Sequence, residues 1–138
     1  MASPRKTAVL VATSVALLAL VVAAQRMQRA HEIREVALIQ FANAQGAVLG
    51  LHTQLKIYHQ LNGFYPTNEQ GLEALVTKPT SSPIPQHWLQ LVFHNSLIDS
   101  WGRLIVYRSP APNGIDAYDL FSLGPDGVES ADDIRAKP

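Results

Sequence analysis

The chain has 138 residues, and its 11 Lys and Arg balance 11 Asp and Glu, so the formal net charge is zero. This length fits a single domain, and the neutral balance argues against general binding to nucleic acid, which requires a basic surface. The absence of cysteine excludes disulfides, thiol catalysis and zinc–thiolate sites. The charges are uneven, because basic residues gather before position 35 and six of the 11 acidic residues lie within residues 116–133.

The first predicted element is an apolar segment, residues 7–24, that carries no charged side chain. As a helix it would be about 27 Å long, close to the roughly 30 Å hydrocarbon core of a bilayer. Its length favours a single membrane anchor. A cleaved signal peptide stays open as the alternative, with the small residues 22–24 (VAA) as the cleavage site. Either interpretation exports the rest of the chain if the N-terminus stays in the cytoplasm.

A long helix is expected to follow, because residues 25–62 contain no proline. Apolar or small side chains recur there in alternating steps of four and three, which is the pattern of one helical stripe. The stripe consists of Ala37, Phe41, Ala44, Val48, Leu51, Leu55 and Tyr58. Asn62 and Gly63 are a usual helix stop, and Pro66 follows shortly. The first half of this helix has nothing in its own domain to pack against, so it needs lipid or partner helices.

Small residues form a second row on this helix, at Ala42, Gly46 and Gly50. Since a glycine costs a helix interior about 1 kcal/mol relative to alanine, the row favours close approach of another helix or of a sheet over simple tolerance of glycine. His52 and His59 are seven residues apart, which is not the spacing of a metal site on one helix.

The rest of the chain predicts a small globular part. A short helix is expected over residues 69–76, capped by Thr67 or Asn68, followed by a proline-rich loop over residues 78–85 and an extended stretch over residues 88–93. A turn is expected at residues 100–102, followed by a strand over residues 104–108. A second turn at 110–114 then leads to a second strand over residues 117–122. This order is typical of an α+β domain whose antiparallel sheet covers the helical stripe. The predicted organisation is therefore an anchor or signal peptide over 1–24, a long amphipathic helix over 25–63, and a head over 64–138.

An acidic loop, SLGPDGVESADDI at residues 122–134, ends the head. Carboxylates on so short a loop repel one another unless a cation holds them, and carboxylate and carbonyl oxygens suit Ca²⁺. The spacing is not that of an EF-hand. From these residues alone, a calcium loop and a solvated acidic loop both stay open.

Four blocks of the head occur in a familiar order. They are YPTNEQGLEALV at 65–76, DSWG at 99–102, YDLFSLGPDG at 118–127 and DDI at 132–134. With these blocks, about residues 36–134 resemble the major pseudopilin (protein G) family of type II secretion. The resemblance implies a pilin-like fold: a long N-terminal helix, membrane-spanning in its first half, packed on a small antiparallel sheet with a C-terminal calcium loop.

The resemblance also implies a function. Members of this family are structural proteins, not enzymes, that polymerise into a periplasmic pseudopilus, which moves folded proteins through an outer-membrane secretin. The implied location is the inner membrane, as a single-pass protein with its C-terminal domain in the periplasm. The implied partners are other pseudopilins, including further copies of the same chain, and the inner-membrane platform proteins.

The family's C-terminal loop binds Ca²⁺. Carried over to the matching positions, Asp126, Asp132 and Asp133 would supply side-chain oxygens. Leu123 and Val128 would supply backbone carbonyls to the same ion.

The N-terminus departs from the family pattern, in which a leader ends in Gly and is followed by Phe-Thr-Leu-x-Glu. Counting back from Tyr65 places these Gly, Phe and Glu positions near Ala8, Val9 and Thr13. The departure speaks against cleavage and methylation by prepilin peptidase, and against assembly as a standard fibre subunit. The alternative function is therefore an exported calcium-binding module, derived from a pseudopilin, that acts outside a fibre.

Overall fold

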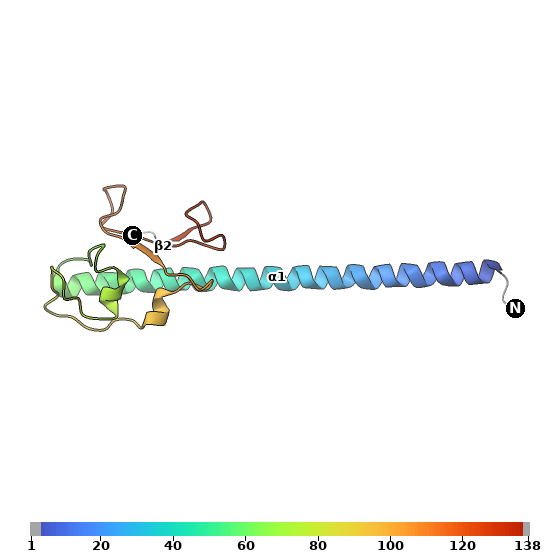
Figure 1. The fold of residues 1–138 in the computed structure, drawn as a ribbon, viewed down its shortest axis with the longest axis horizontal. Helices are drawn as coiled ribbons and strands as arrows, with labels where there is room; N and C mark the ends of the chain where they lie inside the picture. The colour runs from blue at the N-terminus through green and yellow to red at the C-terminus, as the bar shows by residue number, and fades with distance from the viewer. Residues whose placement is uncertain (1–3, 137–138) are drawn as a thin grey trace. The chain divides into compact units, whose positions relative to one another are not determined.

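The computed structural model describes the backbone of residues 4–136 and the side chains of residues 12–136. The chain divides into two compact units, Met1–Leu38 and Ile39–Pro138. One long helix, α1 (Pro4–Asn62), begins in the first unit and ends in the second (Figure 1). It ends as predicted: the Asn62 side chain donates to the Tyr58 carbonyl at 3.1 Å, and the Gly63 amide donates to the His59 carbonyl at 2.7 Å.

The second unit contains a three-stranded antiparallel sheet in the order β1 (Val106–Arg108), β2 (Asp119–Ser122) and β3 (Ile134–Arg135). Two 3₁₀ helices, η1 (Leu72–Leu75) and η2 (His94–Leu97), precede the sheet in the chain. The register pairs Phe121 of β2 with Val106 on one side and Arg135 on the other. This combination of helices and an antiparallel sheet confirms the α+β class.

The helix predicted over residues 69–76 is wrong in its extent, since only η1 forms, after a turn. Thr67 and Gln70 close this turn reciprocally, each amide donating to the other side chain at 3.2 Å. Gly71 then has φ of +58°, a left-handed conformation that no residue of an α-helix adopts. The turn and the helix therefore cannot join into one longer element.

The predicted strands are longer than the observed ones. Residue 104 forms only an isolated bridge with Ile98, and residues 117–118 precede β2. The stretch 88–93 joins no strand, because the amides of Leu91 and Val92 donate instead to the Leu75 carbonyl. The sequence pattern did not predict β3, which is two residues long.

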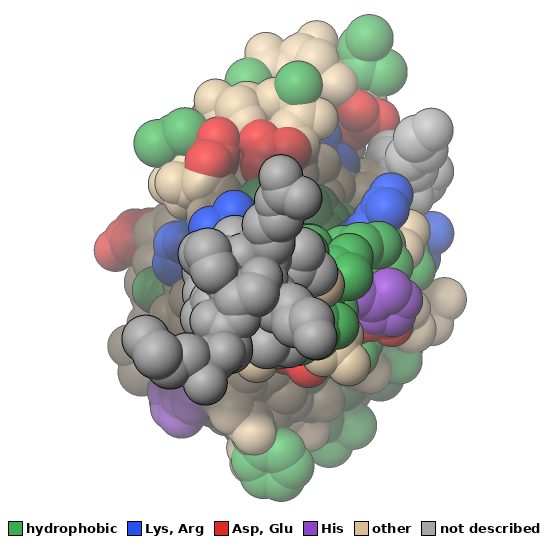
Figure 2. All heavy atoms as spheres, turned by 90° about the vertical axis from the view of Figure 1, so that its right-hand side faces the viewer, with side chains coloured by type: hydrophobic (Ala, Val, Ile, Leu, Met, Phe, Trp, Pro, Cys, Tyr) green, Lys and Arg blue, Asp and Glu red, His purple; other side chains and the backbone are tan. Residues whose placement is uncertain are grey.

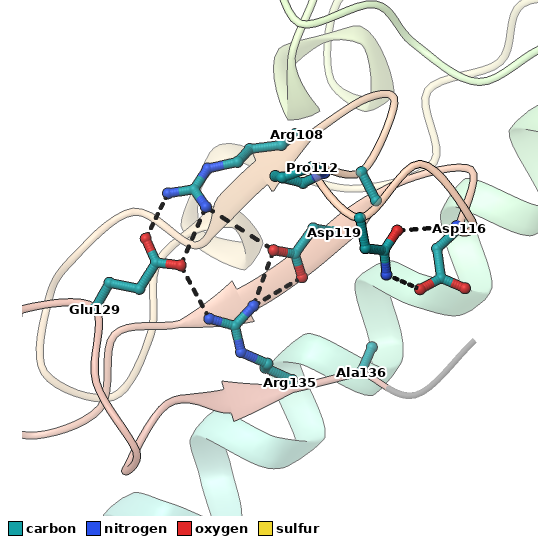
Figure 3. A pocket seen from close by; sticks show the side chains of 9 residues that line it. Arg108, Pro112, Asp116, Asp119, Glu129, Arg135 and Ala136 are labelled. Atoms are coloured by element: carbon teal, nitrogen blue, oxygen red, sulfur yellow. Dashed lines mark hydrogen bonds and ion pairs between the residues drawn. The ribbon is translucent and has the colours of Figure 1, made fainter.

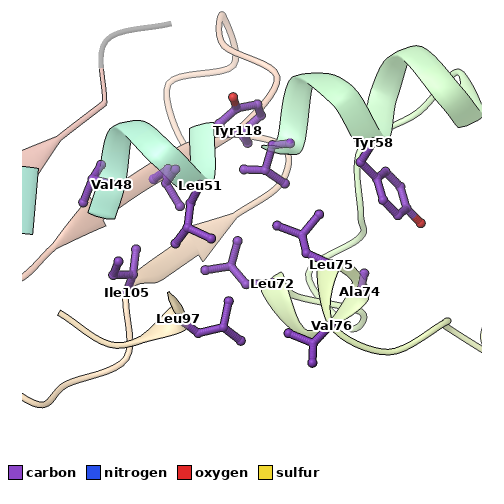
Figure 4. Close-up of a cluster of buried hydrophobic side chains, with 12 residues drawn as sticks. Val48, Leu51, Tyr58, Leu72, Ala74, Leu75, Val76, Leu97, Ile105 and Tyr118 are labelled. Carbon is purple, nitrogen blue, oxygen red and sulfur yellow. The ribbon is translucent and has the colours of Figure 1, made fainter. Parts of the chain in front are cut away.

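The core lies where the helical stripe meets η1 and the sheet (Figure 4). Five members of the predicted stripe are buried: Ala44, Val48, Leu51, Leu55 and Tyr58. All of these except Ala44 pack in one cluster with Leu72 and Leu75 from η1 and with Leu120 from β2. The predicted packing of helix on sheet is confirmed for this part of the stripe.

The row of small residues has a different environment. Ala42, Gly46 and Gly50 are exposed, and a Cβ added at either glycine would meet no atom within 4 Å. The prediction that the sheet approaches closely along this row is therefore wrong. Close approach of a helix from another chain stays a prediction.

Large apolar side chains are exposed along the first unit. Among those described, Leu17, Leu18 and Leu20 are each about two thirds exposed. Residues 7–11 of the predicted anchor lie outside the residues whose side chains are described. Within the part of the chain that the structure describes, no helix meets the length and hydropathy expected of a membrane span.

Candidate functional site

The acidic loop connects β2 to β3, and two of its predicted ligands converge on one hydroxyl. The Ser130 hydroxyl is a hydrogen-bond donor to Asp126 Oδ2, at 3.1 Å, and to Asp132 Oδ1. Asp126 also accepts from the Val128 amide at 3.0 Å through its other oxygen. The loop thus brings Asp126 and Asp132 to a common polar centre.

Asp133 lies beside this centre with its carboxylate engaged elsewhere. Its Oδ1 accepts from the Ser130 amide at 3.3 Å, and its Oδ2 contacts Arg135 Nη2 at 2.8 Å. Its side chain is only 2% exposed. Leu123 is half-buried at the start of the loop, whereas Val128 is 60% exposed at its outer end. The five predicted ligands are therefore in one loop, in different environments.

Buried polar contacts fix the start of the loop. The Asp99 carboxylate accepts from the Trp101 and Arg103 amides, both at 2.9 Å, and from the Ser122 hydroxyl at 2.7 Å. The Ser122 hydroxyl accepts in turn from the Gly124 amide at 3.2 Å. The DSWG block thus forms a turn whose Asp99 side chain hydrogen bonds with Ser122, at the point where β2 ends and the acidic loop begins.

Gly124 is required by a close approach within this loop. It has φ of +66°, and a Cβ there would lie 2.8 Å from both the carbonyl and the Oδ2 of Asp132. The Arg103 side chain hydrogen bonds the Gly124 carbonyl from the other side. A side chain at this position would push Asp132 away from Asp126.

Two arginines on the sheet neutralise the acidic loop, and the pattern did not point to them. Arg108 contacts Glu129 through both of its terminal nitrogens, at 3.1 and 2.7 Å, and Arg135 contacts Asp119 and Glu129 (Figure 3). Arg135 also contacts Asp133. The two arginines line a pocket of 420 Å³. Figure 2 shows both acidic and basic side chains on the face that it draws.

The electrostatic effect is largest at Glu129. Its hydrogen bonds with Arg108 and then Arg135 lower the pKa of the Glu129 carboxyl to about 2. Glu129 is therefore ionised at all physiological pH values. The signal that could have indicated this network is the excess of acidic residues in the loop, which requires counter-charges from the neighbouring strands.

The donor chemistry of the loop fits a hard cation such as Ca²⁺, since carboxylate and hydroxyl oxygens gather there. Within residues 12–136, no three Asp, Glu or His side chains form a ready-made metal cluster. A bound ion would therefore have to draw the three aspartates closer together. The residues that would hold it are Asp126, Asp132 and Asp133, with the carbonyls of Leu123 and Val128.

Two histidines of α1, His52 and His59, contact tyrosine side chains. His52 is buried, and its Nδ1 lies 2.7 Å from the Tyr118 hydroxyl. Burial first, and the charge of Lys56 second, lower the pKa of His52 below 6.5. His59 stacks on Tyr65 with 4.4 Å between ring centroids.

The comparisons with known proteins identify the family. The family model described as type II secretion system (T2SS), protein G matches residues 33–137. The chain belongs to this family. The type II secretion system core protein G of Pseudomonas aeruginosa is 39% identical over 94 residues, which are 67% of this chain and 65% of that protein. The core protein G of Dickeya chrysanthemi is 42% identical over 87 residues, which are 62% of this chain and 56% of that protein.

A solved structure extends the likeness to the fold. The crystal structure of the major pseudopilin from the type 2 secretion system of enterohaemorrhagic Escherichia coli matches with a TM-score of 0.62 and 33% identity. The match covers 75% of this chain and 90% of that one. The predicted pilin-like fold, one long N-terminal helix with a small antiparallel sheet, is confirmed for this protein G family member. The chain spans less than two thirds of the length of the curated relatives named above.

Proposed function

We propose that this chain is a structural pseudopilin of a type II secretion system, contributing to the periplasmic pseudopilus that moves folded proteins across the outer membrane. The observation that carries the proposal is the protein G family match over residues 33–137, on a pilin-like fold. In this role the partners are other pseudopilins, including copies of the same chain, and the inner-membrane platform proteins. The chain acts as a scaffold and not as an enzyme.

The exposed apolar side chains of α1 provide the surface for assembly in this proposal. Val36, Leu38 and Ile39 are each more than half exposed. At about 100° per residue these three side chains point to different sides of the helix. Lipid or neighbouring helices would stabilise them, because both remove apolar surface from water. We further propose that residues 7–24 anchor the chain once in the inner membrane, with the head in the periplasm.

Site-directed crosslinking tests the assembly, since the natural chain has no cysteine to interfere. Leu38→Cys, at an exposed apolar position of α1, should crosslink to other pseudopilins in cells that secrete through this system. Lys78→Cys, in the proline-rich loop of the head, is the matched control at an exposed position outside α1. The absence of crosslinks from Leu38→Cys, Val36→Cys and Ile39→Cys alike would contradict the role.

Membrane anchoring needs its own measurement. The full chain should stay in the membrane fraction after carbonate extraction, and a Leu18→Arg variant should be released. N-terminal sequencing of the mature protein then separates an anchor from a signal peptide. A start at Gln25 would contradict the anchor and favour an exported module.

The calcium role is the second part of the proposal. Asp126, Asp132 and Asp133 would bind Ca²⁺ with the Leu123 and Val128 carbonyls, and the ion would tie the ends of the loop together. What supports it is the convergence of Asp126 and Asp132 on Ser130. Ca²⁺ accepts six to eight oxygens in flexible geometry, so small movements of the loop would complete the site.

Replacing Asp126 with Ala should lower the melting temperature only when Ca²⁺ is present, because it removes a ligand to the ion. Melting of the full chain in detergent, followed by the fluorescence of Trp88 and Trp101, measures the head. Glu69→Ala, an exposed carboxylate outside the loop, is the control. Equal melting of the unsubstituted chain in Ca²⁺ and in EDTA would count against the site.

A further inference from the structure

The Arg135 guanidinium is fixed to the sheet on one side. Its Nη1 contacts Asp119 Oδ1 at 3.0 Å and Oδ2 at 2.8 Å, and its central carbon lies 3.9 Å from the centroid of the Phe121 ring. Phe121 is fully buried on β2, directly opposite Arg135 in the register. Charge and ring contacts together orient the guanidinium across the sheet.

The other side of the same guanidinium reaches the acidic loop. Nη2 contacts Asp133 Oδ2 at 2.8 Å and Glu129 Oε1 at 3.1 Å. Glu129 is also held by Arg108, so the two arginines enclose it (Figure 3). One cationic side chain thus joins three carboxylates, one from β2 and two from the loop.

Asp133 has the strongest need for this contact. Its side chain is 2% exposed, and a carboxylate withdrawn from water is costly unless it is paired and hydrogen-bonded. Asp126 and Asp132 stand close by and carry the same charge. Without a positive partner, Asp133 would be expelled to solvent and the loop would open.

We propose that Arg135 is the resident counter-cation of the C-terminal loop, holding Glu129 and Asp133 against β2 so that the loop keeps its fold when no divalent ion is bound. A consequence, which rests on the proposed calcium site, is that Ca²⁺ shares Asp133 with Arg135. The chain then depends less on Ca²⁺ than a loop of the same acidity without the arginine. Removing Arg135 transfers the whole task of neutralisation to the ion.

Hydrogen exchange of the full chain in detergent, in EDTA and in Ca²⁺, tests this role. Arg135→Gln keeps a polar side chain without the charge. Arg135→Lys keeps the charge but loses the planar guanidinium, which can bind several carboxylates at once. Lys78→Gln is the control for loss of an exposed positive charge. Exchange is compared between residues 123–136 and the helix end, residues 50–62.

In EDTA, the loop of the unsubstituted chain and of Lys78→Gln should exchange slowly. Arg135→Gln should exchange roughly three- to tenfold faster in the loop and unchanged in the helix end, the range expected for a partly exposed ion-pair network. Ca²⁺ should restore slow exchange in Arg135→Gln. Loop exchange in Arg135→Gln in EDTA that is as slow as in the unsubstituted chain would overturn the proposal.

The two proposals fail in different ways. If Arg135→Gln opens the loop in EDTA but Ca²⁺ slows exchange in no variant, Arg135 keeps its role and the calcium site is wrong. If Arg135→Gln exchanges fast in the helix end as well, the head has unfolded. Loop exchange of the Arg135→Lys variant then tests the role of Arg135. Faster exchange of Arg135→Lys that is confined to residues 123–136 supports the counter-cation role. Loop exchange of Arg135→Lys as slow as in the unsubstituted chain overturns it.

Discussion

The two ends of helix α1 carry similar apolar side chains in opposite environments. Leu51 and Leu55 are almost fully buried near its C-terminal end, whereas Leu17 and Leu20 near its N-terminal end are about two thirds exposed. The difference lies in what the rest of the chain provides. Segments distant in sequence, η1 and β2, supply the apolar surface that covers Leu51 and Leu55. Apolar periodicity therefore predicts the face of a helix that will be covered, but not what covers it.

The largest expected effect comes from truncating a leucine in the buried part. Leu55→Ala should lower the free energy of unfolding of the head by about 3 kcal/mol, because it removes packed methyl groups and leaves a cavity. Urea denaturation in detergent, followed by Trp88 and Trp101 fluorescence, measures this loss. Leu20→Ala is the matched control and should change the free energy of unfolding by less than about 0.5 kcal/mol. Equal losses in both variants would remove the contrast between the two ends.

A smaller effect is expected from pH, through His52 in the buried part. The hydroxyl of Tyr118, whose pKa is raised by burial, lies 2.7 Å from Nδ1 of the His52 imidazole. Because burial and Lys56 lower the pKa of His52, the unfolded chain takes up a proton near pH 6.5 that the folded chain refuses. This contribution to stability is fully present above pH 6.5 and declines as the pH falls from 6.5 toward the lowered pKa.

The urea midpoint of the unsubstituted head should therefore fall between pH 7.5 and pH 5. His52→Gln should be less stable at pH 7.5 and should depend less on pH in this range. His87→Gln, an exposed histidine of the head, should keep the full dependence. A His52→Gln variant with the same pH slope as the unsubstituted chain would show that another group causes it.

The smallest effect, and the only gain, is expected on the exposed face of α1. Gly46→Ala and Gly50→Ala should each stabilise the helix by up to about 1 kcal/mol, because a Cβ meets no atom there and alanine is the better helix former. Urea denaturation of the full chain measures the gain. If the row faces a partner helix in the assembled fibre, the same variants should weaken Leu38→Cys crosslinking. Unchanged crosslinking would leave the row without a packing role.

The sequence indicated the family more reliably than the contacts inside the acidic loop. The order of the YPTNEQGLEALV, DSWG and acidic blocks predicted the family, which the comparisons confirm. The ligand set Leu123, Asp126, Val128, Asp132 and Asp133 stays a prediction. The pattern missed Ser130, Arg108 and Arg135, because their contacts depend on which strands become neighbours.

The sequence by itself determined the long helix, its end at Asn62, the buried stripe and the α+β class, because each follows from local periodicity and from proline and glycine signals. Only the tertiary structure decided that residues 69–76 form a turn and a 3₁₀ helix, that β3 exists, and that Gly46 and Gly50 face open space. The same is true of Arg135, whose partners are set by the pairing of β3 with β2. Strand pairing and burial depend on contacts between residues that are far apart in the sequence. The local periodicity of a single sequence does not show which of these residues meet.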